Sequence, residues 1–254
     1  MNDWALITGA SAGIGRELAE LFAADKFPLV LVARNESRLN QLAQDLGARY
    51  GIQTRVLARD LSSPAAPREI FNALQETPVS ILVNNAGFGQ YGPFAGNDLA
   101  VQTRIMQVNM TALVELTHLF LQPMLRRGHG RILNVASTAA FQPGPTVNVY
   151  FASKAFVYSF SYALAEELKG TGITVTTLCP GTTRTEFFER GGFGPVRAPF
   201  TMNARDVAVA GYRGLMRGRR VVIPGVVNKI TSALAKRLPA RLLVGFVKRI
   251  HQKP

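Results

Sequence analysis

The sequence predicts an α/β fold in which one parallel sheet carries helices on both faces. Along the 254-residue chain, short apolar segments with the length of strands alternate with longer segments whose apolar residues recur at helical spacing. No linker, repeat or low-complexity block interrupts the sequence, so we expect one large core. In open sheets of this kind, ligands bind beyond the carboxyl ends of the strands.

The first expected strand, residues 4–8, runs into a glycine-rich turn, and a helix follows over residues 16–24. Gly9, Gly13 and Gly15 permit a sharp turn and a close approach to a diphosphate that faces the helix N–H groups. Glycine also occurs in such turns for steric reasons alone. The position between a strand and a helix favours dinucleotide binding.

The second expected strand, residues 28–33, ends beside Arg34. In a dinucleotide fold this end lies near the adenosine ribose, where an acidic residue binds the 2′-hydroxyl and an arginine pairs with a 2′-phosphate. Arg34 therefore favours NADP over NAD, although an arginine at a strand end can also simply face solvent.

The same alternation identifies the later elements. Strands are expected at residues 53–58, 80–83, 131–136, 173–178 and 219–225, and helices at 36–49, from about 64, 98–127, 150–169 and 204–216. Asp60 follows the third strand, where it could receive an adenine amino group or cap a loop. The residues 84–87 (Asn-Asn-Ala-Gly) follow the fourth strand and suit a backbone crowded against a ligand. Asn109 lies inside a helix although it is a poor helix former.

The fifth strand delivers Ser137 at its end, and the next helix carries Tyr150 and Lys154 four residues apart on one face. An ammonium group favours the ionised form of a nearby phenol, so Lys154 is expected to lower the pKa of Tyr150 toward working pH. Such a phenol can exchange a proton with an alcohol or carbonyl oxygen. Taken alone, this spacing is more typical of a half-buried tyrosine beside a snorkelling lysine.

The net charge of +13 is concentrated in the C-terminal part of the chain. Through residue 206 there are 18 basic and 16 acidic residues, whereas residues 207–254 contain 11 basic and no acidic residues. The single Cys179 and three scattered histidines predict no disulfide within the chain and no metal site. A signal peptide and an apolar run of about 18 residues are lacking, so we expect a cytoplasmic protein, at most peripheral to a membrane.

Together, these motifs resemble the ordered signatures of the classical short-chain dehydrogenase/reductase family over roughly residues 4–225. The matching residues are Thr8, Gly9, Gly13, Gly15, Asp60, residues 84–87, Asn109, Ser137, Tyr150, Lys154, Pro180, Gly181 and Thr185. The resemblance implies a single Rossmann-type doubly wound sheet of seven strands in the order 3-2-1-4-5-6-7, within a catalytic domain of residues 1–225. It also implies hydride transfer between NADP(H) and a carbonyl or secondary alcohol.

The resemblance implies a role for each catalytic residue. Tyr150 is the general acid in reduction and the base in oxidation, Ser137 binds the substrate oxygen, Lys154 holds the nicotinamide ribose, and Asn109 anchors a water of the proton relay. The residues expected to bind the cofactor are Thr8, Gly9, Ser11, Gly13, Ile14, Gly15, Arg34, Asp60, Leu61, Asn85, Ala86, Gly87, Tyr150, Lys154, Pro180, Gly181, Thr183 and Thr185. Ala12 departs from many NADP-using members, which have a basic residue there, so the NADP preference depends mainly on Arg34.

Residues 186–203 correspond to the substrate lid of the family. Glycines and prolines surround four phenylalanines there, Phe187, Phe188, Phe193 and Phe200. Phe187 and Phe188, with Phe88, Phe141 and Tyr91, are candidate walls for an apolar substrate. The alternative is that these rings pack the lid onto the body of the protein.

Residues 226–254 read as a basic amphipathic extension of two short helices, broken at Pro239. The extension could dock on its own body or on a second subunit, or it could lie on an anionic membrane through residues 229–254. No motif supports specific nucleic-acid binding. The family resemblance implies a homodimer or homotetramer. A nucleotide-sensing or scaffold protein without turnover is the alternative function, and the intact Ser137, Tyr150 and Lys154 argue against it.

Overall fold

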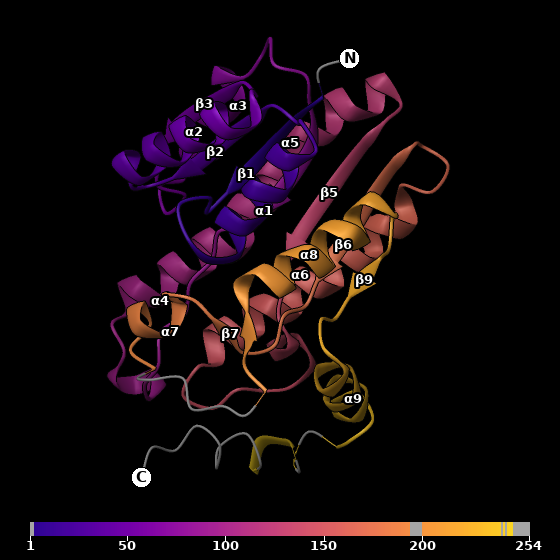
Figure 1. Ribbon diagram of the computed structural model, residues 1–254. Coiled ribbons are helices and arrows are strands. Elements are labelled where there is room, and N and C mark those ends of the chain that lie inside the picture. The colour runs from indigo at the N-terminus through magenta and orange to yellow at the C-terminus, as the bar shows by residue number, and fades with distance from the viewer. Residues whose placement is uncertain (1–2, 194–199, 240, 242, 246–254) are drawn as a thin grey trace.

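A seven-stranded parallel sheet forms the centre of the protein (Figure 1). The computed structural model describes residues 3–193, 200–239, 241 and 243–245. The strands of the sheet are β1 (Trp4–Thr8), β2 (Leu29–Ala33), β3 (Thr54–Ala58), β4 (Val79–Asn84), β5 (Gly130–Val135), β6 (Ile173–Leu178) and β9 (Val221–Val222). Their order, β3-β2-β1-β4-β5-β6-β9, confirms the expected topology. The seventh strand of the sheet is the ninth along the chain because β7 (Thr183–Arg184) and β8 (Met202–Asn203) pair separately.

Two layers of helices cover the sheet. One face carries α1 (Gly13–Ala24), α2 (Glu36–Tyr50) and α8 (Ala204–Met216), and the other carries α3 (Ala66–Ala73), α5 (Ala112–Arg127) and α6 (Asn148–Glu167). Successive residues of β1 point to opposite faces, so Ala5 and Ile7 enter one core and Leu6 enters the other. A central parallel strand must be apolar on both sides, which explains the uninterrupted apolar runs of the sequence.

The segment after β4 does not form the single regular helix expected over residues 98–127. It passes through a short 3₁₀ turn (Phe94–Gly96), α4 (Leu99–Met106) and a π-helical turn, Gln107–Thr111, before α5 begins. Asn109 lies in the π turn and is buried. A π turn inserts an extra residue into the helix, and such turns occur frequently at functional sites.

The carboxyl ends of the strands meet the lid and the C-terminal helix, at the lower side of Figure 1. The lid follows β7 and begins with the single-turn helix α7 (Phe187–Arg190), and residues 194–199 lie outside the described residues. Phe200, one of the expected lid phenylalanines, is 69% exposed. The edge strand β9 is shorter than the predicted segment 219–225 because only Val221 and Val222 pair with β6.

Helix α9 (Val226–Ala235) packs one face on the body of the protein. Ser232 and Ala235 are buried, and the Lys236 Nζ that follows lies 4.3 Å from the centre of the Phe141 ring. Apolar side chains on its other face are exposed: Val226, Ile230, Leu234 and then Leu238. The helix ends before Pro239, as expected, but most of the second predicted helix lies outside the described residues. Within the described part of the chain, no helix is long and apolar enough to cross a membrane.

Candidate active site

The glycine-rich turn is joined to the end of β4 by a small hydrogen-bond network. The buried Thr8 hydroxyl donates to the Val83 carbonyl and accepts from the backbone N–H groups of Asn85 and Ala86, each at 3.0 Å. The Asn85 amide donates to the Thr8 carbonyl at 2.9 Å. These bonds fix the expected cofactor loop against its neighbouring strand. A second amide, Asn84, bonds to Asn134 at 2.9 Å and thereby ties β4 to β5.

This turn fits the diphosphate of a dinucleotide. Helix α1 begins at Gly13 without a side-chain cap, so its first-turn N–H groups suit an anionic ligand. At Gly15 a Cβ atom would overlap the Gly9 carbonyl oxygen, which excludes any larger residue. At Gly13 a Cβ atom would stand 3.0 Å from Cγ2 of Thr185, so the residue just before the lid lies against the turn. Ser11 and Ile14 are half-buried in the same turn, with Ile14 packed on the core.

At the adenosine end, Arg34 is exposed just beyond β2, a position that fits both a residue at the ribose and the solvent-facing alternative. Asp60 caps its own loop, because its carboxylate accepts from the Ser62 N–H at 3.0 Å. This contact supports the capping alternative, and it leaves the second carboxylate oxygen for an adenine. Leu61 is buried in the core under α3 and α5.

Strand β5 and helix α6 bring the three catalytic candidates together. Ser137 lies two residues after the end of β5 and caps the 3₁₀ turn Thr138–Phe141 by accepting from Ala139 N–H at 3.1 Å. Its hydroxyl also contacts the Pro180 carbonyl at 3.3 Å and forms a hydrogen bond with Tyr150. Lys154, one turn after Tyr150, is buried, and its Nζ donates to the Val135 carbonyl at 2.8 Å. Both hydroxyls therefore lie at the carboxyl edge of the sheet.

The Asn109 side chain is held at both ends. Its Oδ1 accepts from the Phe88 N–H at 3.1 Å, and its Nδ2 donates to the Phe88 carbonyl at 3.0 Å and to Ser153 Oγ at 3.0 Å. Ser153 in turn donates to the Tyr150 carbonyl at 2.7 Å. Asn109 therefore joins the π turn to the loop after β4 and to the first turn of α6. Gly87 lies between the side chains of Asn109 and Lys154, since a Cβ there would stand 3.1 Å from Asn109 Oδ1 and 3.2 Å from Lys154 Nζ.

The electrostatics differ from the expectation for the Tyr150 and Lys154 pair. Burial raises the pKa of Tyr150 to about 12, and the hydrogen bond with Ser137 lowers it only in part. Burial also lowers the pKa of Lys154 to about 8. The Lys154 ammonium lies 5.7 Å from the centre of the Tyr150 ring and is directed at the Val135 carbonyl. The expected lowering of the Tyr150 pKa by Lys154 is therefore wrong for this arrangement, because desolvation raises this pKa by more than the hydrogen bond with Ser137 lowers it.

The lid places one of its phenylalanines against the catalytic tyrosine. The ring centres of Phe187 and Tyr150 are 5.1 Å apart, and Phe188 and Phe193 pack on Phe187 at 5.5 Å. Of the other proposed walls, Tyr91 joins this group, because its ring centre lies 6.0 Å from that of Phe193. The remaining two walls have other partners. Phe141 packs against Tyr158, and Phe88 packs partly buried on the core under α5. Thr183 is buried in β7, and its hydroxyl donates to the Gly181 carbonyl at 2.9 Å.

Sequence reasoning missed three contributors to the site. Ser153 lies three residues after Tyr150, a helical spacing that could have revealed it. At Gly89, a Cβ would stand 3.1 Å from the Tyr150 ring, so the glycine makes room for that ring. The ion pair of Arg38 with Glu186 joins residues 148 positions apart, and no local sequence signal predicts such a contact.

The chain is similar to known proteins in both sequence and fold. Residues 3–191 match the model of a protein family described as short chain dehydrogenase. Sulfoacetaldehyde reductase 2 of Chromohalobacter salexigens is 40% identical over 191 residues, or 74% of this chain and 75% of that protein. The very-long-chain 3-oxoacyl-CoA reductase of Rattus norvegicus is 28% identical over 100% of this chain and 82% of its own length. A short-chain dehydrogenase from Sphingobium yanoikuyae, solved in complex with NADPH, has a TM-score of 0.84 and 34% identity, covering 93% of this chain and 96% of that chain.

The lowered pKa of Lys154 predicts a pH-dependent stability. Between its folded value of about 8 and the unfolded value of about 10.4, the unfolded chain binds more protons, so the contribution of Lys154 to the free energy of unfolding rises with pH. Relative to Lys154→Met, wild type should gain about 2 kcal/mol in free energy of unfolding from pH 7 to pH 10. Urea titrations at both pH values measure this difference. Lys169→Met, at an exposed position, is the control. If the difference in free energy of unfolding between wild type and Lys154→Met is the same at pH 7 and pH 10, the lowered pKa of Lys154 is contradicted.

Proposed function

Since this chain belongs to the classical short-chain dehydrogenase/reductase family and is an oxidoreductase that transfers hydride, we propose that it reduces apolar carbonyl compounds with NADPH, or oxidises the matching alcohols with NADP. The observation that carries this proposal is the cluster of Ser137, Tyr150 and Lys154 at the carboxyl edge of the sheet, beside a glycine-rich turn that fits a diphosphate. Tyr150 is the proposed proton donor.

The proposed mechanism uses two hydroxyl groups on one oxygen. The nicotinamide, when bound, supplies hydride to the carbonyl carbon. The Ser137 and Tyr150 hydroxyls lie within hydrogen-bond reach of each other, so one substrate oxygen that contacts both can accept from both once the Ser137 hydroxyl turns from the Pro180 carbonyl. Tyr150 then donates its proton to the oxygen as negative charge develops. A pKa of about 12 keeps this phenol protonated at neutral pH, as a proton donor in reduction must be.

Lys154 and Asn109 position this donor. Lys154 uses one N–H for the Val135 carbonyl, and its remaining donors are available for the ribose hydroxyls of the cofactor. With a pKa of about 8 it carries a positive charge in most molecules at neutral pH. Asn109 holds the Phe88 backbone and, through Ser153, the carbonyl of Tyr150. These bonds support a fixed orientation of the first turn of α6.

Two features support the cofactor and the substrate class. Arg34 stands exposed beyond β2 and can pair with a 2′-phosphate, which supports NADP over NAD. The Phe187 ring packs at a tilt against the Tyr150 ring, and Phe188 and Phe193 extend this apolar wall. The names of the two relatives, sulfoacetaldehyde reductase and very-long-chain 3-oxoacyl-CoA reductase, differ in substrate, so the proposal of an apolar substrate depends on this wall.

We propose that the protein forms a homodimer or homotetramer through α5 and α6. Large apolar side chains stand exposed on both helices: Leu125 at 37%, Phe156 at 41% and Tyr162 at 47%. Phe156 is also stacked on Phe160 with an interplanar angle of 3°. Exposed aromatic residues of this kind are enriched at protein interfaces.

The role of Tyr150 predicts a large loss of turnover on removal of its hydroxyl. Tyr150→Phe should lower kcat for NADPH-dependent reduction by about 10² to 10⁴-fold, because the proton donor is lost. NADPH oxidation with ketones, aldehydes and 3-oxoacyl thioesters measures this change. Tyr162→Phe, an exposed position on the same helix, should retain wild-type rates. Wild-type protein that binds NADPH but turns over none of these compounds would favour a nucleotide sensor instead.

The role of Arg34 predicts a change in cofactor selectivity. Arg34→Asp should lower the ratio of kcat/KM for NADPH over NADH by at least about tenfold, because a carboxylate repels the 2′-phosphate and accepts from a 2′-hydroxyl. Arg49→Asp, at the opposite end of α2, is the matched control and should keep the wild-type ratio. An unchanged ratio in Arg34→Asp would remove the basis for the NADP assignment.

The proposed interface predicts a change in mass. Phe156→Lys should shift the protein from dimer or tetramer to monomer at micromolar concentration, because it places a charge within an apolar contact. Light scattering after size exclusion measures the mass directly. Phe94→Lys changes a ring that is more exposed (55%) and lies outside α5 and α6, and it should keep the oligomer. A monomeric wild-type protein would contradict the proposal.

A further inference from the structure

Thr185 and the first two residues of the lid, Glu186 and Phe187, reach three different parts of the predicted cofactor site. Thr185 lies against Gly13 of the glycine-rich turn, where a Cβ would stand 3.0 Å from its Cγ2. Glu186 forms an ion pair with Arg38 of α2. The Phe187 ring lies 5.1 Å from the ring of Tyr150. The segment therefore connects the diphosphate turn, the adenosine end and the catalytic tyrosine.

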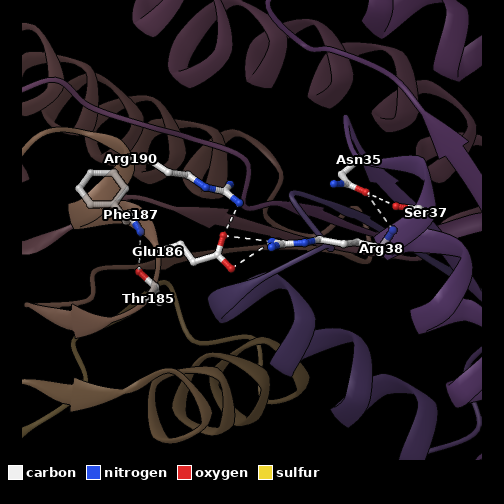
Figure 2. Close-up of polar contacts among 7 residues, drawn as sticks. All are labelled: Asn35, Ser37, Arg38, Thr185, Glu186, Phe187 and Arg190. Carbon is white, nitrogen blue, oxygen red and sulfur yellow. Dashed lines mark hydrogen bonds and ion pairs between the residues drawn. The ribbon is translucent and has the colours of Figure 1, made fainter.

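Arg38 is held at the adenosine end by the cap of α2. The Asn35 side chain accepts from the Arg38 N–H at 2.9 Å, which fixes Arg38 in the first turn of the helix, four residues after Arg34. Its Nη1 lies 3.0 and 3.1 Å from the two carboxylate oxygens of Glu186. Figure 2 shows the side chains of Arg38 and Arg190 directed at this carboxylate from different sides. The guanidinium beside the predicted ribose site thus already holds an anion supplied by the lid.

We propose that Arg38 is a second specificity-determining residue for the 2′-phosphate of NADP, and that Glu186 competes with this phosphate for it. A guanidinium group binds carboxylate and phosphate oxygens with the same planar set of donors, so one anion can replace the other. A 2′-hydroxyl carries no charge and does not displace Glu186. The inference rests on the proposed preference for NADP. It adds a second basic residue for the 2′-phosphate, because the glycine-rich turn has Ala12 where many NADP-using members have a basic side chain.

The exchange is favoured by the surroundings of the pair. The side chains of Arg38 and Glu186 are 48% and 41% exposed, and ion pairs in contact with water contribute little to stability. Glu186 also pairs with Arg190, one helical turn later, so its carboxylate keeps a partner when Arg38 is withdrawn. A phosphate dianion attracts Arg38 more strongly than a shared carboxylate does.

The competition couples the lid to the cofactor. While Glu186 holds Arg38, the start of the lid is tied to α2 at the adenosine end of the predicted cofactor site. Binding of the 2′-phosphate releases this tie, and by linkage the tie weakens NADP binding by the same factor. NAD binds without breaking the ion pair, so the start of the lid keeps its contact with α2.

Calorimetric titration with NADP⁺ and NAD⁺ tests the proposal without turnover. Arg38→Gln should weaken NADP⁺ binding about tenfold, because a charge-assisted contact is lost. Glu186→Gln should tighten NADP⁺ binding about two- to fivefold, the contribution of an exposed ion pair. Neither change should alter the affinity for NAD⁺. In the double variant R38Q/E186Q, the affinity for NADP⁺ should equal that of Arg38→Gln, because Glu186 acts through Arg38.

The Arg49 and Glu20 ion pair, at the other end of α2, supplies matched controls. Arg49→Gln and Glu20→Gln should leave both affinities at the wild-type values. Tighter NADP⁺ binding by R38Q/E186Q than by Arg38→Gln would overturn the proposal, since Glu186 would then act by its general charge. Unchanged NADP⁺ binding in Arg38→Gln, alongside a loss in Arg34→Asp, would also overturn it and leave the proposed function intact. Wild-type protein with equal affinity for NADP⁺ and NAD⁺ would instead overturn the proposed NADP preference itself.

Discussion

The site depends on hydrogen bonds between the buried side-chain amide of Asn109 and the backbone of the loop after β4. Asn109 satisfies both the N–H and the carbonyl of Phe88, which follows the last strand residue by only a few positions. A loop that runs beside a ligand cannot pair with a neighbouring strand, and buried backbone groups without partners cost about 1–3 kcal/mol each. The amide takes the place of that missing strand. Asn109 lies in the π turn, so the irregular part of the helix supplies the side chain that satisfies the backbone of the loop at the sheet edge.

The same amide carries this order into the catalytic helix. Its second N–H bond goes to Ser153, which donates to the Tyr150 carbonyl. On the opposite side, Lys154 donates to the last carbonyl of β5. Helix α6 is therefore held by polar contacts from two neighbouring elements, and its Tyr150 hydroxyl meets Ser137 without any bond to Lys154. The arrangement favours a protonated phenol, since both the phenol and the ammonium lie away from water.

Much of the fold was predictable from the sequence because the spacing of apolar residues and the placement of glycines are local properties. The strands from β1 to β6 begin and end within about one residue of the predicted ranges, and the motif residues fall at their carboxyl ends as expected. The π turn was not predictable, since apolar residues such as Ile105 and Leu116 keep helical spacing on both sides of it. The pKa of Tyr150 was predicted with the wrong sign, because a sequence shows which charges are near but not how much water is lost. Contacts between distant segments, such as Arg38 with Glu186, depend on how the lid folds back and leave no periodic signal.

Helix α9 covers residues next to the catalytic groups, and this affects how the surroundings of the site can change in evolution. Lys236 lies over the rings of Phe141 and Tyr158, and its Nζ donates to the Tyr158 hydroxyl at 3.2 Å. These rings belong to the elements that carry Ser137 and Tyr150, yet their cover comes from beyond the last strand. Changes in length or sequence after β9 can therefore reshape the rim next to the reacting groups while the hydrogen bonds of the sheet edge stay intact. The C-terminal segment offers a route to new selectivity that is separate from the chemistry.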